Sequence, residues 1–387
     1  MDGQATQSRC APATGGFLRF FQDMPDPRAA NAIHKFTDIL VLAFCAVLCG
    51  ADGWVDVETF SSSKLSWFKT FLELPAGIPS HDTFGRVFAA LQPEAFERCF
   101  TGWMASLVSL GQGKLIAIDG KSIRRSFQHA WDKSGMAHLV SAFVAANGLV
   151  FAQVAVKDKE NEIVAIPQLL ELLDLKGSVV SIDAIGCQRK IAVQIVEAGG
   201  DYLLAVKENQ PALHEQVQKL MDELILESHS APSQAIDHGF VQTVDGDHGR
   251  IETRRVWVSD EVDWIKLEEP WPHLGSVIAV ESVREVGGVA GTERRYYVSS
   301  LRGTDAARGA ELVRGHWSVE NNLHWHLDVT FNEDQRRIRT GHGPENFSRL
   351  CRMALNRLKS DQAKGSLRTK RLKASWDDYY LFKLLTT

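Results

Sequence analysis

The feature that most constrains the fold is an apolar run that ends on an acid and recurs later in the chain. Residues 115–118 read Leu-Ile-Ala-Ile and lead directly into Asp119 and Gly120. Residues 179–182 read Val-Val-Ser-Ile and lead into Asp183, 64 residues later (183 − 119). Continuous apolar runs of this length are typical of strands buried on both faces of a sheet. Desolvating an unpaired carboxylate costs several kcal/mol, so each Asp either caps a turn or contributes to a shared charged site.

The order of the expected elements favours a mixed α/β fold. After the strand at 115–119, the dipeptide Asn147-Gly148 predicts a hairpin between strands at 138–145 and 149–156. Helix-linked strands follow, with a helix at 162–173, a strand at 179–183, a helix at 188–198 and a strand at 202–206. A hairpin-led antiparallel part followed by helix-linked strands predicts a mixed sheet with helices packed on it.

A second β-rich interval follows a predicted helix at 211–226. It contains strand residues at 251–258 and two further runs, 277–286 and 292–301, on either side of Gly287-Gly288. We expect this interval, about residues 208–302, to be an insertion in the mixed-sheet domain.

The flanking regions differ from this central domain, which we place at residues 111–355. Residues 1–16 are small and polar and are expected to be disordered. Residues 17–110 predict a helical N-terminal domain, in which Ser80 is the expected N-cap of one helix and Pro93 opens the next. Short helices joined by a tight turn could form a helix-turn-helix DNA reader, although simple helix packing is commoner.

Charge is distributed unevenly along the chain. The whole protein carries a formal charge of −5, but the segment from Arg349 to Lys373 holds nine Lys or Arg residues and one acid, Asp361. We expect residues 356–387 to form a basic C-terminal tail. Its cations would attract DNA phosphates regardless of sequence, or would simply keep the surface soluble. The residues expected to contact DNA there are Arg368, Lys370, Arg371 and Lys373.

Cysteine spacing and hydropathy indicate a cytoplasmic protein without a membrane span. The six cysteines are scattered and form no Cys-x-x-Cys pair, so neither a zinc ribbon nor a disulfide framework is indicated. The longest apolar run, residues 39–49, is about half of the ~20 residues that a membrane helix requires.

A third carboxylate completes a candidate metal site. Glu320 lies in a predicted helix, residues 305–328, beside an apolar stripe that includes Val319 and Leu323. With Asp119 and Asp183, it would supply the oxygen ligands that Mg²⁺ and Mn²⁺ prefer. Two such ions about 4 Å apart can activate an attacking oxygen and stabilise a leaving oxygen in phosphoryl transfer.

These motifs resemble the DDE transposases of bacterial insertion sequences, in the branch that contains the H-repeat-associated proteins. The segments that carry the resemblance are 79–88, 118–122, 181–184, 248–254 and 316–325. The resemblance implies an RNase H-like catalytic domain and identifies Asp119, Asp183 and Glu320 as the catalytic and metal-binding acids, with two Mg²⁺ or Mn²⁺ ions per site. It also implies metal-dependent cleavage and strand transfer of double-stranded DNA, including terminal inverted repeats and target DNA, by a homo-oligomer assembled on that DNA.

The sequence departs from the Tyr-x₂-Arg-x₃-Glu-x₆-Lys signature of related transposases. Aligned on Glu320, the Tyr, Arg and Lys positions hold Val313, His316 and Leu327. We expect His316 to replace the Arg in part, as a hydrogen-bond donor to a DNA phosphate.

Other interpretations of the same residues stay open. The histidines 316, 324, 326 and 342 could bind zinc, although their spacing matches no zinc motif. Lys121, Arg124 and Arg125 could guide the DNA backbone or form a solvated turn. Trp317 and Trp325 are expected in the core. The protein could also be a catalytically inactive DNA-binding relic or a plain metal-dependent nuclease, which strand transfer would distinguish from a transposase.

Overall fold

The computed structural model describes residues 16–107, 113–127, 136–156, 162–230, 239–247, 250–286 and 289–386. Three predictions lie outside these ranges. They are the disorder of residues 1–15, the turn at Gly287-Gly288, and the start of the motif at 248–254.

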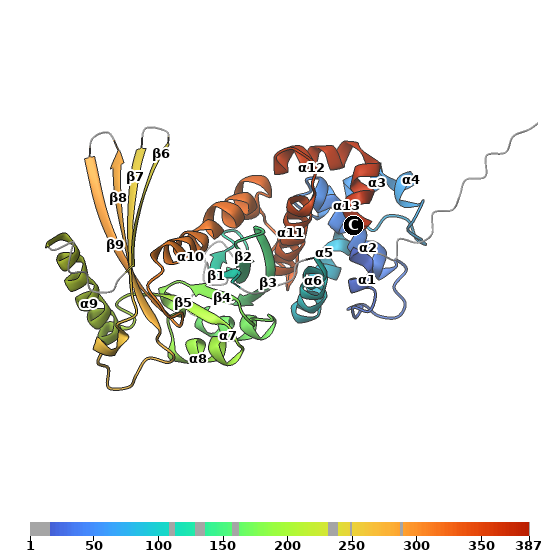
Figure 1. Ribbon diagram of the computed structural model, residues 1–387. Coiled ribbons are helices and arrows are strands. Elements are labelled where there is room, and N and C mark those ends of the chain that lie inside the picture. The colour runs from blue at the N-terminus through green and yellow to red at the C-terminus, as the bar shows by residue number, and fades with distance from the viewer. Residues whose placement is uncertain are drawn as a thin grey trace, which may run out of the picture.

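One nine-stranded mixed sheet, in the order β3-β2-β1-β4-β5-β9-β8-β7-β6, forms the body of the protein (Figure 1). Strand β1 (Leu115–Ser122) pairs antiparallel with β2 (His138–Val144), which pairs antiparallel with β3 (Leu149–Val156). On its other side β1 pairs parallel with β4 (Val179–Ile182), which pairs parallel with β5 (Asp201–Val206). The predicted mixed α/β architecture is therefore confirmed.

The parallel pairing of β1 with β4 explains why the two strand-end acids meet. Ile118 lies opposite Ile182 in the register, so Asp119 and Asp183 both follow this last pair. Their side chains leave the sheet at the same edge. The structure thus places the two repeated motifs on neighbouring strands.

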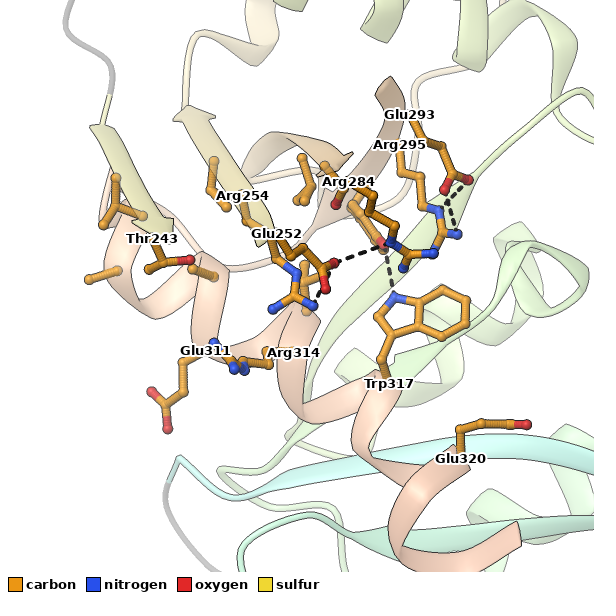
Figure 2. A pocket seen from close by; sticks show the side chains of 18 of the residues that line it. Thr243, Glu252, Arg254, Arg284, Glu293, Arg295, Glu311, Arg314, Trp317 and Glu320 are labelled. Atoms are coloured by element: carbon orange, nitrogen blue, oxygen red, sulfur yellow. Dashed lines mark hydrogen bonds and ion pairs between the residues drawn. The ribbon is translucent and has the colours of Figure 1, made fainter. Parts of the chain in front are cut away.

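The β-rich interval continues the same sheet. Strand β9 (Val289–Ser299) pairs with β5 and is followed outward by β8 (Ser276–Val286), β7 (Arg250–Ser259) and β6 (Gly239–Asp247). Helix α9 (Pro211–Ser230) lies beside these outer strands (Figure 1). The opposite side of the outer strands faces helix α10 (Ala306–Val319), which Figure 2 shows passing beneath them.

Helices from both ends of the chain pack together at the far side of the inner strands. The N-terminal set comprises α1 (Phe17–Phe21), α2 (Phe36–Cys49), α3 (Trp54–Ser63), α4 (Leu65–Phe68), α5 (His81–Ala90) and α6 (Pro93–Leu107). The hydroxyl of Ser80 accepts a hydrogen bond from Thr83 N, which confirms it as the N-cap of α5. The C-terminal set comprises α11 (Gly343–Ser360), α12 (Leu367–Trp376) and α13 (Asp378–Thr386). Most of residues 356–386, the predicted basic tail, therefore lie in these helices.

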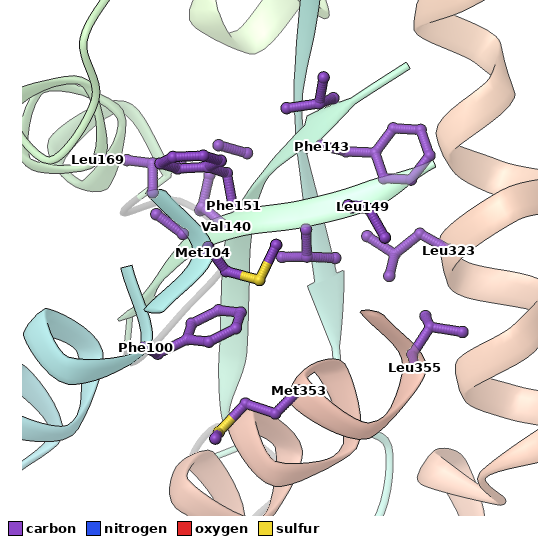
Figure 3. Close-up of a cluster of buried hydrophobic side chains, with 14 of the residues drawn as sticks. Phe100, Met104, Val140, Phe143, Leu149, Phe151, Leu169, Leu323, Met353 and Leu355 are labelled. Atoms are coloured by element: carbon purple, nitrogen blue, oxygen red, sulfur yellow. The ribbon is translucent and has the colours of Figure 1, made fainter. Parts of the chain in front are cut away.

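Helix α11 joins the helical layer to the sheet. Figure 3 shows Met353 and Leu355 of α11 in one apolar cluster with Phe100 of α6 and with Phe143 and Leu149 of the sheet. All five side chains are essentially buried. Helix α7 (Glu162–Glu171) packs against β2 and β3, and helix α8 (Arg189–Glu197) packs against α7 and β5 (Figure 1).

None of the described helices is by itself long and apolar enough to span a membrane. Helices α2 and α3, which meet at 97°, pass that test only as a bent pair.

Candidate active site

Asp119 and Asp183 each accept a hydrogen bond from the backbone of a residue that follows. Strand β1 continues to Ser122, so Asp119 lies inside the strand, which corrects the predicted strand end at residue 119. Oδ1 of Asp119 accepts a hydrogen bond from Gly120 N at 2.9 Å, and Oδ1 of Asp183 accepts one from Ile185 N at 3.1 Å. Asp183 is the N-cap of a short 3₁₀ turn, Ala184–Gly186. Both carboxylates stay partly exposed. These backbone hydrogen bonds therefore hold the acids in place and leave them able to contribute to a site.

Helix α10 brings the third acid to the same edge. A Cβ at Gly315 would collide with the side chain of Leu115, so the absence of a side chain lets α10 lie directly against β1. The helix is continuous through Gly315. Glu320 then opens a π-helical segment, Glu320–His324, and π-helical turns are frequent at functional sites.

His324 joins the acids, and the sequence did not assign it to them. Its Nδ1 lies 3.2 Å from Oε2 of Glu320 and 3.7 Å from Oδ2 of Asp119. Candidate ligand atoms of these three residues all lie within 4.8 Å of one another. Burial lowers the pKa of His324, which favours the neutral ring that can bind a cation. The sequence did contain a signal for this contact, because His324 follows Glu320 by four residues and such residues are neighbours on a helix.

The electrostatics of the site favour a bound cation. Burial, helped by the negative charges of Asp183, Glu320 and Glu162, raises the pKa of Asp119 to about 7, although the hydrogen bond from Gly120 N opposes this rise. Asp183 is therefore close enough to influence Asp119, although it is not in the compact donor set. Mutually repelling carboxylates of this kind are stabilised when a divalent ion neutralises them.

We expect the affinity for Mn²⁺ to fall about tenfold for each pH unit below 7, because a proton then competes with the ion for Asp119. Electron paramagnetic resonance of free Mn²⁺ measures this affinity without requiring activity. The Asp119→Asn variant should bind Mn²⁺ weakly, with a flatter pH dependence. If the affinity of the wild-type protein for Mn²⁺ were constant between about pH 5.5 and 8, this would contradict the role of Asp119.

A buried His–Glu pair lies against the end of β1 that follows Asp119. His138 Nε2 lies 2.5 Å from Oε1 of Glu162, both side chains are almost fully buried, and His138 Nδ1 lies 2.8 Å from Ser122 Oγ. A Cβ at Gly120 would collide with both members of this pair. Gly120 thus lets the strand end lie against the pair. Sequence reasoning gave no role to His138 or Glu162, which are separated from Asp119 by a hairpin.

The expected contact between His316 and a DNA phosphate needs correction. His316 is only 4% exposed, and its Nδ1 lies 3.0 Å from Ser181 Oγ. Burial lowers its pKa to about 4, so the ring is neutral near pH 7. A neutral, buried side chain that is already hydrogen-bonded can reach a phosphate only if the helix repacks. Its structural role is to connect α10 to β4.

The basic residues after Asp119 lie near the site, with different exposures. Lys121 is mostly buried and pairs with Asp328 at 2.8 Å. Arg124 is 79% exposed and pairs with Asp334 at 3.1 Å, and Arg125 is also exposed. Arg124 and Arg125 therefore remain available to a DNA backbone. Lys121 is instead mostly buried in its ion pair with Asp328.

Two of the four C-terminal residues expected to bind DNA are buried, which corrects that expectation. Lys370 donates to the carbonyls of Leu358 and Asp361, and Arg371 donates to the carbonyls of Thr330 and Val47. Arg349, Arg352 and Arg357 from the same basic run are buried as well. Arg368 and Lys373 are exposed, and they keep the proposed role.

Trp317 and Trp325 were expected in the core, and this was wrong. They are 45% and 52% exposed. The apolar stripe of α10 faces the sheet through Leu312, Val319 and Leu323, which turns both indoles outward. Of the histidines considered for zinc, only His324 lies in the donor set found among the described residues.

Comparison with known proteins identifies the class. Residues 110–357 match the family model described as the transposase DDE domain, and residues 18–104 match the model of its associated segment. The first match covers more than half of the chain. The chain therefore belongs to the DDE transposase family.

Particular relatives agree with the branch inferred from the motifs. The chain is 40% identical over 372 residues to the "H repeat-associated putative transposase YhhI" of Escherichia coli (strain K12), covering 94% of this chain and 95% of that protein. It is 47% identical over 64 residues to the "Inactive transposase YbfQ" of the same organism, covering 16% of this chain and 76% of that protein. A solved piggyBac transposase synaptic complex with hairpin DNA aligns over 95% of this chain and 77% of its own, at 8% identity and a TM-score of 0.39, which is too low to support an argument.

Proposed function

We propose that this protein is an active transposase that cleaves the ends of an insertion sequence and joins them to target DNA. The observation that carries the proposal is the convergence of Asp119, Glu320 and His324 within 4.8 Å, beside Asp183, at the point where the pairing of β1 with β4 ends. The strand order β3-β2-β1-β4-β5, with β1, β4 and β5 parallel, supports an RNase H-like catalytic core.

The donor set fits Mg²⁺ or Mn²⁺, because carboxylate oxygens dominate it, and a cation would offset the burial and the neighbouring negative charges that raise the pKa of Asp119. We propose that Asp119, Asp183 and Glu320 hold two such ions. When bound, the ions would activate the attacking oxygen and stabilise the leaving oxygen of the phosphodiester. The chain itself orients the ligands. The carboxylates of Asp119 and Asp183 accept backbone hydrogen bonds, and α10 packs against β1.

The partners proposed for this site are duplex DNA carrying the terminal inverted repeats, target DNA, and further copies of the chain assembled on that DNA. The exposed cations Arg124, Arg125, Arg368 and Lys373 would contribute sequence-independent affinity for phosphates.

The test uses the full-length protein and a labelled duplex that ends in the repeats flanking its gene, together with a supercoiled target. We expect cleavage at the repeat end and covalent joining to the target in Mg²⁺ or Mn²⁺, and neither product in excess chelator. A duplex with a shuffled repeat is the control. Cleavage without joining would indicate a nuclease. Binding without cleavage would indicate an inactive relic, as the name of one relative suggests for that relative.

A further inference from the structure

One ammonium group connects three elements beside the proposed active site. Lys359 lies near the end of α11, and its Nζ donates hydrogen bonds to the carbonyl oxygens of Gly148 at 2.7 Å and Asn322 at 2.6 Å. Gly148 belongs to the turn between β2 and β3, and Asn322 belongs to the π-helical segment Glu320–His324. Lys359 therefore joins α11 and the hairpin to the segment that carries two candidate metal ligands.

No acid accounts for the position of this ammonium. In the part of the chain that the structure describes, no carboxylate pairs with Lys359, and burial alone lowers its pKa to about 8. A desolvated cation without a counter-ion is costly. The ring of Phe143, whose centroid lies 5.5 Å from Nζ, offsets part of this cost. The two hydrogen bonds to carbonyl oxygens are therefore the main polar interactions that keep the charged group in place.

The turn of the β2–β3 hairpin leaves room for the ammonium. Gly148 has a φ of 66°, in the left-handed region that favours glycine. A Cβ at Gly148 would lie 3.2 Å from Nζ of Lys359, so a side chain there would crowd the hydrogen bond. Glycine at this position thus permits both the turn and the contact with α11.

The π-helical segment on the other side of the ammonium depends on external contacts. Trp325 N donates to the carbonyl of Glu320, which is the five-residue spacing of a π-helix. Such turns are rare and occur mostly as short insertions in α-helices, so tertiary contacts have to favour them over the ordinary helix. Asn322 lies midway between Glu320 and His324. A hydrogen bond to its carbonyl therefore acts on the backbone that carries both ligands.

The same interaction relates the helix ligands to the sheet. The hairpin turn extends β2, the neighbour of the strand that carries Asp119. Figure 3 shows Leu323 of the π-helical segment beside Phe143 and Leu149 of this hairpin. Lys359 adds a polar link to this apolar contact, and it holds the segment at a fixed distance from the strands.

We propose that Lys359 is a positioning residue for the proposed active site. It holds the π-helical segment against the hairpin, so that Glu320 and His324 stay within reach of Asp119. The proposal rests on the proposed function, because it specifies what keeps that site assembled. It also gives the last turn of α11 a part in the site, although α11 supplies none of the candidate metal ligands.

The test compares Lys359→Met with Lys359→Arg in the full-length protein. Methionine keeps most of the length and the apolar packing but removes the donors, whereas arginine keeps the charge and the donors. We expect Lys359→Met to weaken Mn²⁺ binding about 10- to 100-fold, measured by electron paramagnetic resonance of free Mn²⁺, and Lys359→Arg to restore part of it.

Two further readouts locate the effect. Backbone hydrogen exchange in residues 320–330 should be about tenfold faster in Lys359→Met than in the wild-type protein. The cleavage rate at saturating DNA should fall by about the same factor as Mn²⁺ binding, with little change in DNA affinity.

The matched control is Lys364→Met, which removes an exposed lysine beyond α11 and should change none of these quantities. Unchanged Mn²⁺ binding and exchange in Lys359→Met would overturn the proposal, and so would faster exchange spread evenly over the whole sheet. If Lys359→Met does not fold, Lys359→Gln, which keeps a neutral donor, decides between the same outcomes. A wild-type protein that cleaves no DNA, but shows the Lys359-dependent Mn²⁺ binding and exchange, would count against the proposed function alone.

Discussion

Replacing Asp119 with Asn, Asp183 with Asn or Glu320 with Gln is expected to reduce metal-dependent cleavage and joining by about 10³-fold or more. Each change keeps the size of the side chain and removes a ligand charge from one shared site. Because the three acids would act as a unit, the double variants should be little worse than the single ones. The measurement is the single-turnover rate on the repeat-end duplex in Mg²⁺.

The fold should survive these changes, and Asp119→Asn should even be more stable in the absence of metal. The folded-state pKa of Asp119 is about 7, above its ordinary value of 3.8, so its contribution to stability is present at low pH and is lost as the pH rises through 7. Removing the charge should therefore add a few kcal/mol, at most about 4, to the free energy of unfolding above pH 7. Asp260→Asn replaces an exposed acid and is the matched control. It should change neither the cleavage rate nor the free energy of unfolding. Near-normal cleavage by any one of the three variants would refute their joint role.

Replacing Arg352 with Met is expected to destabilise the protein by about 3–5 kcal/mol, because it leaves Glu333 charged and buried without its main partner. Nη1 of Arg352 lies 3.0 Å from Oε1 of Glu333, and both side chains are completely buried. The charge of Arg352 is the first of several that hold the pKa of Glu333 below its usual value against the effect of burial. In the variant that carboxyl should bind a proton more readily, so the loss should shrink as the pH falls.

Urea unfolding, followed by circular dichroism, measures this loss. The double variant Glu333→Gln with Arg352→Met should recover part of the stability, since it removes the orphaned charge. Arg368→Met, at an exposed position on α12, is the control and should change the unfolding free energy by less than about 0.5 kcal/mol. An equal effect of Arg352→Met and Arg368→Met would show that the buried pair contributes nothing.

The sequence predicted the parts of the fold that depend on local pattern. Apolar runs located β1, β4 and β5, Asn147-Gly148 located the β2–β3 hairpin, and Ser80 located the start of α5. The approach of Asp119 to Asp183 also followed, because parallel neighbouring strands end at one edge. These inferences need only the period of a strand and the chemistry of a turn.

Features that depend on distant partners could not be predicted in this way. Arg349 and Arg352 looked like surface cations, because nothing near them in the sequence shows that Glu97 and Glu333 would pair with them in the interior. His324 and Trp317 depend on how α10 is rotated against the sheet. Gly315 allows that packing, because a side chain there would collide with Leu115. Leu115 lies 200 residues earlier in the chain (315 − 115), so the sequence around Gly315 does not show the contact.

The packing of both chain ends into one helical layer has a consequence for the order of synthesis. Helix α2 is buried along almost its whole length, and α11 and α12 supply part of its cover. Helix α11 begins 294 residues after α2 ends (343 − 49). At about 5–20 residues per second, the ribosome needs roughly 15–60 s to make the intervening chain. For that interval the most apolar helix of the nascent protein waits without its final neighbours. Glu320 and His324 are also made late, so the proposed active site is completed only on a chain that has been almost fully translated.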